Sequence, residues 1–276
     1  MTEYLSYKFT DNETFINTFD EAPLWSGAFG LLLLKHLELK KDISVIDIGS
    51  GAGFPLMELA GRLGASCKLY GLDPWKNANT RARQKIINYQ YSNVEIIEAS
   101  AEKIPFDDNS IDLIVSNLGI NNFEKPEIVF KECARVLKPK CKLVLTTNLN
   151  GHWKQFYNVF ESTLKQLQKN DLLANLYANQ EHRGSVESIS KLFTDNGFKV
   201  CRHFEEYFEM KFADGSAFLN HHFVKIGWLD SWKALLPIED HEQIFKSMEE
   251  NLNAFSKTNN GLILTVPMAY FEGEKI

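Results

Sequence analysis

Five short apolar runs alternate with segments of helical spacing between residues 43 and 147, and this alternation constrains the fold most strongly. The runs are rich in β-branched residues and are, in chain order, ISVIDIG, CKLYGLD, VEIIEA, IDLIVSN and CKLVLTT. Continuous apolar strands are typical of a sheet covered on both faces, and strand–helix alternation is typical of parallel order. The pattern therefore predicts an α/β fold with a doubly wound, mostly parallel sheet.

The segments outside this core predict two more strands and a mostly helical cap. KVCRHFEEYFEMKF (199–212) and GLILTVPMAYFE (261–272) both have strand character. We expect three parts: an N-terminal lid and helix (1–42), a ligand-binding core (43–150) and a C-terminal part (151–276). The last part is expected to complete the sheet with about 185–212 and 261–272, and to insert helical cap segments at about 151–183 and 213–258.

Charge and apolar patterning disfavour several kinds of partner. Lys and Arg number 30 against 36 acidic residues without a basic cluster, which argues against nucleic acid. The start MTEYLSYKFTDNET does not resemble a secretory signal, and the run GAFGLLLLKHLEL (27–39) is shorter than the roughly 20 residues of a membrane span. The four cysteines lack zinc-type spacing. We therefore expect a cytoplasmic protein with no membrane partner and no metal.

Three glycines, Gly49, Gly51 and Gly53, follow the first core strand and precede a helical pattern. Glycine adopts positive φ and lets a ligand approach the backbone, so such a turn is typical of a cofactor site, with a tight structural turn as the alternative. The dinucleotide fingerprint GxGxxG fails at Phe54, and Pro55 has no N–H to offer a pyrophosphate. The loop therefore favours a ligand without phosphates.

Two carboxylates accompany this loop. Asp73 ends the second strand, where a carboxylate can accept hydrogen bonds from both hydroxyls of a ribose. The alternative for Asp73 is a helix N-cap ahead of Pro74. Asp47 lies within the apolar first strand, where an unpaired acidic side chain is costly, so we expect it to face the pocket. The ligand is therefore expected to carry a nucleoside.

These motifs resemble those of class I S-adenosylmethionine-dependent methyltransferases, in particular the type 11 group that includes the quinone-biosynthesis methyltransferases. The resemblance rests on VIDIGSGAGF, GLD, EASAEKIPFDDNSIDLIVSN and ECARVLKPKCKLVLTTN. It covers about residues 25–150 and, weakly, 183–212. It implies a Rossmann-like methyltransferase fold with a seven-stranded sheet, and S-adenosyl-L-methionine as the cofactor.

The resemblance also implies, by position, which residues lie along the cofactor from its methionine end to its sulfonium. They are Asp47, Gly49, Gly51 and Gly53 at the methionine end, Asp73 at the ribose, Ser100, Ala101 and Glu102 along the adenine, and Asn117 and Leu118 beside the sulfonium. Ser100 stands where the family commonly has an acidic residue, and it is a weaker acceptor for the adenine amino group.

Methyl transfer from a sulfonium depends mainly on alignment, so a general base is needed only if the nucleophile must lose a proton. The histidines are the obvious proton acceptors near neutral pH, and at most one is expected to act; a packing or solvated role is the alternative for each. The candidate bases are His152, His221 and His222. The substrate-pocket candidates are Tyr7, Trp25, Asn121 and Asn122, with core packing or an ordinary turn as the alternatives.

The sequence thus predicts a methyltransferase that acts on a small-molecule acceptor. A non-catalytic sensor or scaffold that binds S-adenosylmethionine or S-adenosylhomocysteine is the alternative, because a fold by itself does not fix a function. A nicotinamide-dependent reductase is disfavoured by Phe54 and Pro55.

Overall fold

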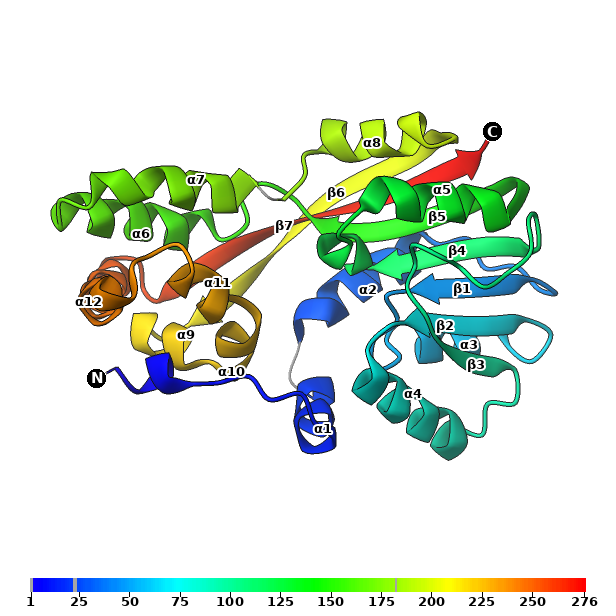
Figure 1. Ribbon diagram of the computed structural model, residues 1–276, viewed down its shortest axis with the longest axis horizontal. Helices are drawn as coiled ribbons and strands as arrows, with labels where there is room; N and C mark the ends of the chain where they lie inside the picture. The colour runs from blue at the N-terminus through cyan, green and yellow to red at the C-terminus, as the bar shows by residue number, and fades with distance from the viewer. Residues whose placement is uncertain (1, 22–23, 182) are drawn as a thin grey trace. The chain divides into compact units, whose positions relative to one another are not determined.

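The computed structural model describes residues 2–21, 24–181 and 183–276 (Figure 1). Residues 1, 22 and 23 of the expected lid, and His182 of the expected cap, lie outside this range. Within it, seven strands form one sheet in the order β3-β2-β1-β4-β5-β7-β6. The strands are β1 (Ser44–Ile48), β2 (Lys68–Asp73), β3 (Val94–Glu98), β4 (Ile111–Asn117), β5 (Leu137–Asn148), β6 (Phe198–Phe212) and β7 (Leu262–Lys275).

The sheet is parallel from β3 through β5, and β7 runs antiparallel to β5. Chain order reverses between β1 and β4, so the carboxyl ends of these two strands form the switch point where ligands bind in such folds. The apolar runs lie in the core as predicted: Val45 and Ile46 of β1 are fully buried. The predicted doubly wound, mostly parallel, seven-stranded sheet is confirmed.

Helices connect most of the strands; α2 packs on β5 and β4, α3 on β2, and α4 on β3. No described helix combines the length and the apolar character needed to cross a membrane. The helices are α1 (Glu13–Glu21), α2 (Leu24–His36), α3 (Leu56–Leu63), α4 (Lys76–Tyr89), α5 (Pro126–Val136), α6 (Lys154–Gln166), α7 (Leu173–Glu181), α8 (Val186–Asp195), α9 (Gly215–Asn220), α10 (His222–Val224), α11 (Asp230–Lys233) and α12 (His241–Thr258). Short 3-10 segments are η1 (Glu3–Ser6), η2 (Gly119–Asn122), η3 (Asn170–Leu172) and η5 (Ile238–Asp240), and η4 (Lys225–Leu229) is a π-helical turn.

The chain forms two compact units. The sheet unit comprises Asp11–Asn148, Gly184–Glu206 and Met268–Ile276, and the helical unit comprises Met1–Thr10, Leu149–Arg183 and Tyr207–Pro267. The strands β6 and β7 each have residues in both units.

The helical unit has an aromatic core, in which α12 packs on α6 and α9. The ring centroids of Trp153 and Trp228 lie 4.6 Å apart, and those of Phe156 and Trp232 lie 4.3 Å apart. Large aromatic side chains bury extensive apolar area, so these rings give the unit a core separate from that of the sheet unit.

Candidate cofactor and active site

The loop between β1 and α3 is shaped by three glycines with positive φ. Gly49, Gly51 and Gly53 have φ angles of 73°, 51° and 98°, a region that residues with a side chain adopt rarely. The N–H of Gly49 donates to the carbonyl of Leu72 at 2.8 Å, which ties the loop to β2. The predicted glycine turn therefore lies at the carboxyl ends of β1 and β2.

The glycines differ in what surrounds them. A methyl group built on Gly51 would meet no atom within 4 Å beyond its two neighbours in the chain, so the space beside its backbone is open. A methyl group on Gly49 would lie 3.1 Å from the Cα of Gly119, and one on Gly119 would lie 2.8 Å from the carbonyl oxygen of Ile48. The loop after β1 and the turn after β4 thus approach each other closely, while the backbone at Gly51 remains accessible to a ligand.

Asp73, at the end of β2, is 9% exposed and holds the glycine loop through its side chain. Its Oδ2 accepts from the N–H of Gly51 at 2.9 Å, and its Oδ1 accepts from the N–H of Trp75 at 2.8 Å. Burial raises the pKa of Asp73, and these two hydrogen bonds oppose the rise. Each carboxylate oxygen has a second lone pair, so Asp73 can still accept hydrogen bonds from ribose hydroxyls.

Asp47 is fully buried in β1, and neither of its carboxylate oxygens has a hydrogen-bond partner of normal geometry in the described chain. The pKa of Asp47 is raised well above its usual value, mainly because burial desolvates the carboxylate and also because Asp73 carries a charge nearby. The Leu56 N–H lowers this pKa in part without forming such a bond. A buried acid without a partner is unfavourable, so Asp47 is suited to a cationic ligand group.

The segment after β3 brings the expected adenine residues beside β2. Asp73 pairs with Glu98 in the register of β2 and β3, and Ser100, Ala101 and Glu102 follow within four residues. The N–H of Glu102 donates to the hydroxyl of Ser100 at 3.2 Å, which closes a local turn. Ala101 is buried. These three residues therefore lie on the strand end next to that of Asp73.

Asn117 and Leu118 end β4 in an unusual conformation. The side chain of Asn117 accepts from the hydroxyl of Thr146 at 2.8 Å and donates to the carbonyl of Ser26 at 3.1 Å. Leu118 has a φ of 67°, which is uncommon for a residue other than glycine and costs about 1–2 kcal/mol. This left-handed turn redirects the chain from β4 into η2, so Asn117 serves to position the backbone beside Leu118.

Asn121, in η2, is bound on both sides by residues of β5. Its Oδ1 accepts from the hydroxyl of Thr147 at 2.7 Å, and its Nδ2 donates to Oδ1 of Asn148 at 2.8 Å. Asn122, the next residue, is exposed. Among the expected pocket residues, Asn121 is thus the one that the structure holds in a defined hydrogen-bond network at the carboxyl ends of β4 and β5.

Trp25 also belongs to the sheet unit. It is 8% exposed in α2, and its ring centroid lies 5.2 Å from that of Phe29. The carbonyl of the next residue, Ser26, receives the hydrogen bond from Asn117. The residue after Trp25 is therefore hydrogen-bonded to the end of β4, whereas the ring of Trp25 packs in the core.

Tyr7, His221 and His222 belong to the helical unit. The ring centroid of Tyr7 lies 6.1 Å from that of His222, and the ammonium of Lys225 lies 5.4 Å from the Tyr7 ring. Burial raises the pKa of Tyr7, and Asp230 adds to the rise. The pKa of His221 is lowered, first by burial and then by the neighbouring side chains of His222 and Lys225. These three candidates are thus gathered on one part of the helical unit.

His152 lies in the aromatic core of the helical unit and is 3% exposed. Its ring stacks on Trp153 and Trp228 at centroid distances of 4.4 and 5.8 Å. Burial, assisted by the charge of Arg183, lowers the pKa of His152 well below its usual value. The imidazole is therefore neutral near pH 7 and is packed as a core side chain.

Two side chains that sequence reasoning missed hold the backbone around the glycine loop. Lys85 of α4 donates from Nζ to the carbonyl of Ala52 at 2.8 Å and so holds the glycine loop. Asn79, fully buried in α4, donates to the carbonyl of Asp73 at 2.8 Å. The polar residues TTN (146–148) at the end of an apolar strand are a sequence signal for a site at the end of β5. The hydrogen bond from Lys85 to Ala52 has no such signal, because the two residues lie far apart in the chain.

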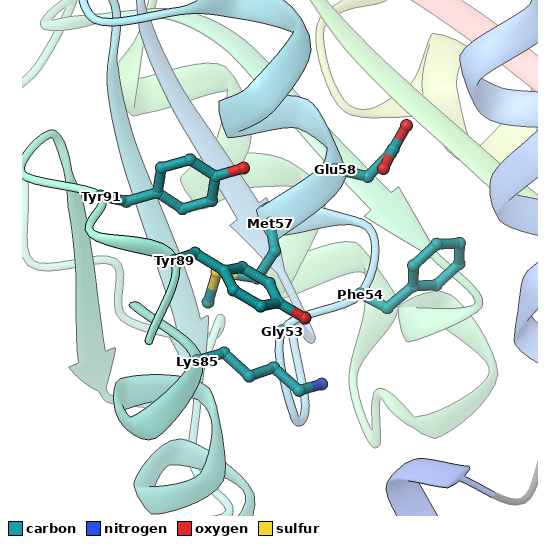
Figure 2. A pocket seen from close by; sticks show the side chains of 7 residues that line it. All are labelled: Gly53, Phe54, Met57, Glu58, Lys85, Tyr89 and Tyr91. Carbon is teal, nitrogen blue, oxygen red and sulfur yellow. The ribbon is translucent and has the colours of Figure 1, made fainter. Parts of the chain in front are cut away.

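A pocket of about 420 Å³ lies against the glycine loop, between the start of α3 and the second half of α4 (Figure 2). Among its lining residues, only Gly53 was predicted as a site residue. The lining residues are Gly53, Phe54, Met57, Glu58, Lys85, Tyr89 and Tyr91. Glu58 is paired with Arg62 at 2.7 Å. The described residues contain no cluster of side chains suited to a metal ion.

Comparisons with known proteins place these residues in a known group. Residues 46–145 match the family model of a methyltransferase domain. Demethylmenaquinone methyltransferase of Chlorobaculum tepidum is 29% identical over 184 residues, which cover 63% of this chain and 73% of that protein. The enzyme of the same name from Geobacillus sp. (strain WCH70) is 31% identical over 178 residues, which cover 60% of this chain and 74% of that protein.

Solved structures agree on the fold. The structure of a candidate methyltransferase from Bacillus halodurans C-125 matches with a TM-score of 0.60. It is 18% identical in sequence, and the match covers 90% of this chain and 99% of that one. At this identity the likeness is evidence for the fold alone.

Proposed function

We propose that this chain, a member of the class I S-adenosylmethionine-dependent methyltransferases of the type 11 group, methylates a small molecule. The proposed acceptor carries an oxygen-bearing unsaturated ring, as in a quinol. The methyltransferase activity and the cofactor, both predicted from the sequence, are confirmed. The ring class is supported by the names of the relatives, which are demethylmenaquinone methyltransferases.

The residues at the strand ends fit S-adenosylmethionine. The open backbone at Gly51 gives the ligand room, and the buried, unpartnered carboxylate of Asp47 suits a cationic group. Asp73 retains lone pairs for ribose hydroxyls beside the same loop. The unpaired Asp47 carboxylate is the observation that carries this assignment, because burial of such a group is unfavourable without a ligand.

When bound, the cofactor supplies an electrophilic methyl group, which forms a bond to the acceptor as its bond to sulfur breaks and the electron pair stays on sulfur. The protein's contribution is alignment and exclusion of water. The close approach of Gly49 and Gly119 fixes the end of β4 against the cofactor loop. The left-handed turn at Leu118 then determines where the chain leaves that strand.

The acceptor specificity is proposed to lie largely outside residues 46–145. The matched range falls entirely within the sheet unit, which holds the cofactor residues, so the helical unit is available for acceptor choice. Loss of the hydroxyl proton to a base makes the ring carbon of a quinol nucleophilic; after methyl transfer the hydrogen of that carbon leaves as a proton and the oxygen is reprotonated, so one proton is released overall. One of His152, His221 and His222 is proposed as the base if the protein supplies one.

Transfer of isotopically labelled methyl groups tests the proposal. Purified protein is incubated with labelled S-adenosylmethionine and the small-molecule fraction of a cell extract, and with a demethylmenaquinol carrying a short side chain. Label in a ring-methylated product is expected, with Gly51→Val as the inactive control. Label in a different class of small molecule would correct the acceptor. Cofactor binding without any transfer would favour the sensor or scaffold instead.

A further inference from the structure

The hydrogen bonds between η2 and β5 run in one direction when the Thr147 proton is assigned to its nearer acceptor. The Oγ1 atom of Thr147 lies 2.7 Å from Oδ1 of Asn121 and 3.3 Å from the backbone carbonyl oxygen of Asn148, so the shorter contact takes the one hydroxyl proton. The Nδ2 of Asn121 in turn donates to Oδ1 of Asn148 at 2.8 Å. The carboxamide oxygen of Asn148 is therefore occupied, and its NH2 group is directed away from the network as a donor.

Asn148 is 3% exposed, and the side-chain hydrogen bond that the described chain gives it is the one that its Oδ1 accepts from Asn121. Its Nδ2 is not among the fully buried side-chain atoms without a partner, so this NH2 group keeps access to solvent and can be reached by a ligand. Thr147 and Asn121 thus fix the orientation of the Asn148 side chain.

The position of Asn148 associates this donor with the acceptor. Asn148 ends β5, the neighbour of β4, and ligands of such sheets bind at the carboxyl ends of strands beside the switch point. The expected cofactor residues occupy the ends of β1, β2, β3 and β4. The end of β5 is the next parallel strand end along the sheet, on the β4 side where the sulfonium is expected.

We propose that Asn148 donates a hydrogen bond from Nδ2 to an oxygen of the methyl acceptor, and that Thr147 and Asn121 are positioning residues for it. An NH2 group can only donate, so it selects a carbonyl, phenolate or carboxylate oxygen. A phenolate is favoured, because hydrogen bonds to charged acceptors are about twice as strong as neutral ones. The inference rests on the proposed function and deepens it.

The first test compares Asn148→Asp with the wild-type protein. The aspartate keeps the oxygen that accepts from Asn121 but replaces the donor by a second oxygen, which repels a phenolate. Labelled-methyl transfer is measured at saturating S-adenosylmethionine against increasing amounts of the extract fraction. The apparent KM for the acceptor should rise by about 10-fold or more, while the affinity for S-adenosylhomocysteine stays within about twofold of the wild-type value.

Thr147 provides the matched pair of variants. Thr147→Val removes the hydroxyl at nearly constant shape and should raise the apparent KM, by less than Asn148→Asp does. Thr147→Ser keeps the hydroxyl and should restore the wild-type value. In ¹⁵N spectra without acceptor, the side-chain NH2 signal that disappears in Asn148→Asp should shift in Thr147→Val and hold its position in Thr147→Ser.

The outcomes separate the two proposals. Absence of methyl transfer by the wild-type protein, despite S-adenosylhomocysteine binding, would overturn the proposed function together with this inference. Transfer by the wild-type protein with an unchanged acceptor KM in Asn148→Asp would overturn the inference alone. An equal loss of S-adenosylhomocysteine affinity would also overturn it, because Asn148 would then act on the cofactor site.

Discussion

The N–H of Gly51 donates to Oδ2 of Asp73 across 2.9 Å, so the most open glycine of the cofactor loop is tied directly to the carboxylate at the end of β2. One carboxylate thereby shapes the loop. We propose that the same carboxylate holds the ribose, which would couple cofactor affinity to loop geometry through this side chain.

Asp73→Ala should weaken S-adenosylmethionine binding by about 1–3 kcal/mol, because hydrogen bonds of a charged group are lost. Titration calorimetry of the purified variant measures this change. Asp112→Ala is the control, since Asp112 also accepts a backbone N–H, from Ser44 at 2.9 Å, but lies near the start of β4, at the end of the strand away from Asn117, where it also pairs with Lys138. An unchanged affinity in a folded Asp73→Ala protein would mean that the ribose is held elsewhere.

Gly51→Val should abolish cofactor binding while the sheet stays folded. The substitution places a branched side chain in the open space beside the loop and forces it into a φ of 51°. Gly64→Val is the control for strain, because Gly64 has a φ of 75° and equally open surroundings at the end of α3. Both variants should lose stability, measured by urea denaturation. Equal cofactor affinities in the two variants would remove the loop assignment.

Asp47 should make the cofactor-free protein less stable as the pH rises. Its pKa in the folded state lies well above the value of about 3.9 for an unfolded chain. Between those two values the folded protein retains a proton that the unfolded chain has lost, so the free energy of unfolding falls with increasing pH. Asp73, whose pKa is also raised, contributes in the same direction.

Asp47→Asn should therefore flatten this pH dependence and be more stable than the wild-type protein at pH 7, while it binds S-adenosylmethionine more weakly. Urea denaturation across pH 4–8 and calorimetry check the two effects. A variant that is less stable than the wild-type protein at every pH would show that Asp47 has a structural partner instead.

Lys85→Met should reduce cofactor affinity, although Lys85 follows the loop by more than thirty residues. The hydrogen bond from its Nζ to the Ala52 carbonyl restrains the loop, and its loss should cost about 0.5–1.5 kcal/mol of binding free energy. Lys68→Met, at the exposed start of β2, is the control. Identical S-adenosylmethionine affinities for both variants would mean that the loop keeps its shape without Lys85.

The histidines should be tested singly as Asn variants once an acceptor is known. Loss of a true base should lower turnover by roughly 10²–10⁴-fold with cofactor affinity nearly unchanged. His152 should also affect the pH dependence of stability. Because its pKa is lowered in the folded state, the folded protein binds fewer protons than the unfolded chain below about pH 6.5. The free energy of unfolding therefore falls as the pH drops. His152→Asn should lose that dependence, and normal turnover in all three variants would favour pure alignment.

The sequence was most informative where the signal is local. The glycines before α3 and the acids of β1 and β2 stand next to the strands that position them, so pattern and spacing were sufficient to predict their place at these strands, while their roles stay predictions. The pairing of Thr146 with Asn117 depends instead on the register of β4 and β5, and the return of Asn121 to Thr147 depends on the left-handed Leu118. Neither register nor a positive φ at leucine is encoded in a short pattern, so the roles of Thr147 and Asn148 required the structure.

The place of β7 has a consequence for how the protein is made. β7 lies between β5 and β6 in the sheet although it is the last of the three to be synthesised. Until residues 262–275 leave the ribosome, the edge of β5 that faces away from β4 lacks the strand that pairs with it in the folded protein. Open strand edges pair readily with other molecules. Translation of this protein therefore includes an interval of aggregation risk that closes when β7 inserts, and a nonsense mutation within β7 would remove an interior strand rather than trim an edge.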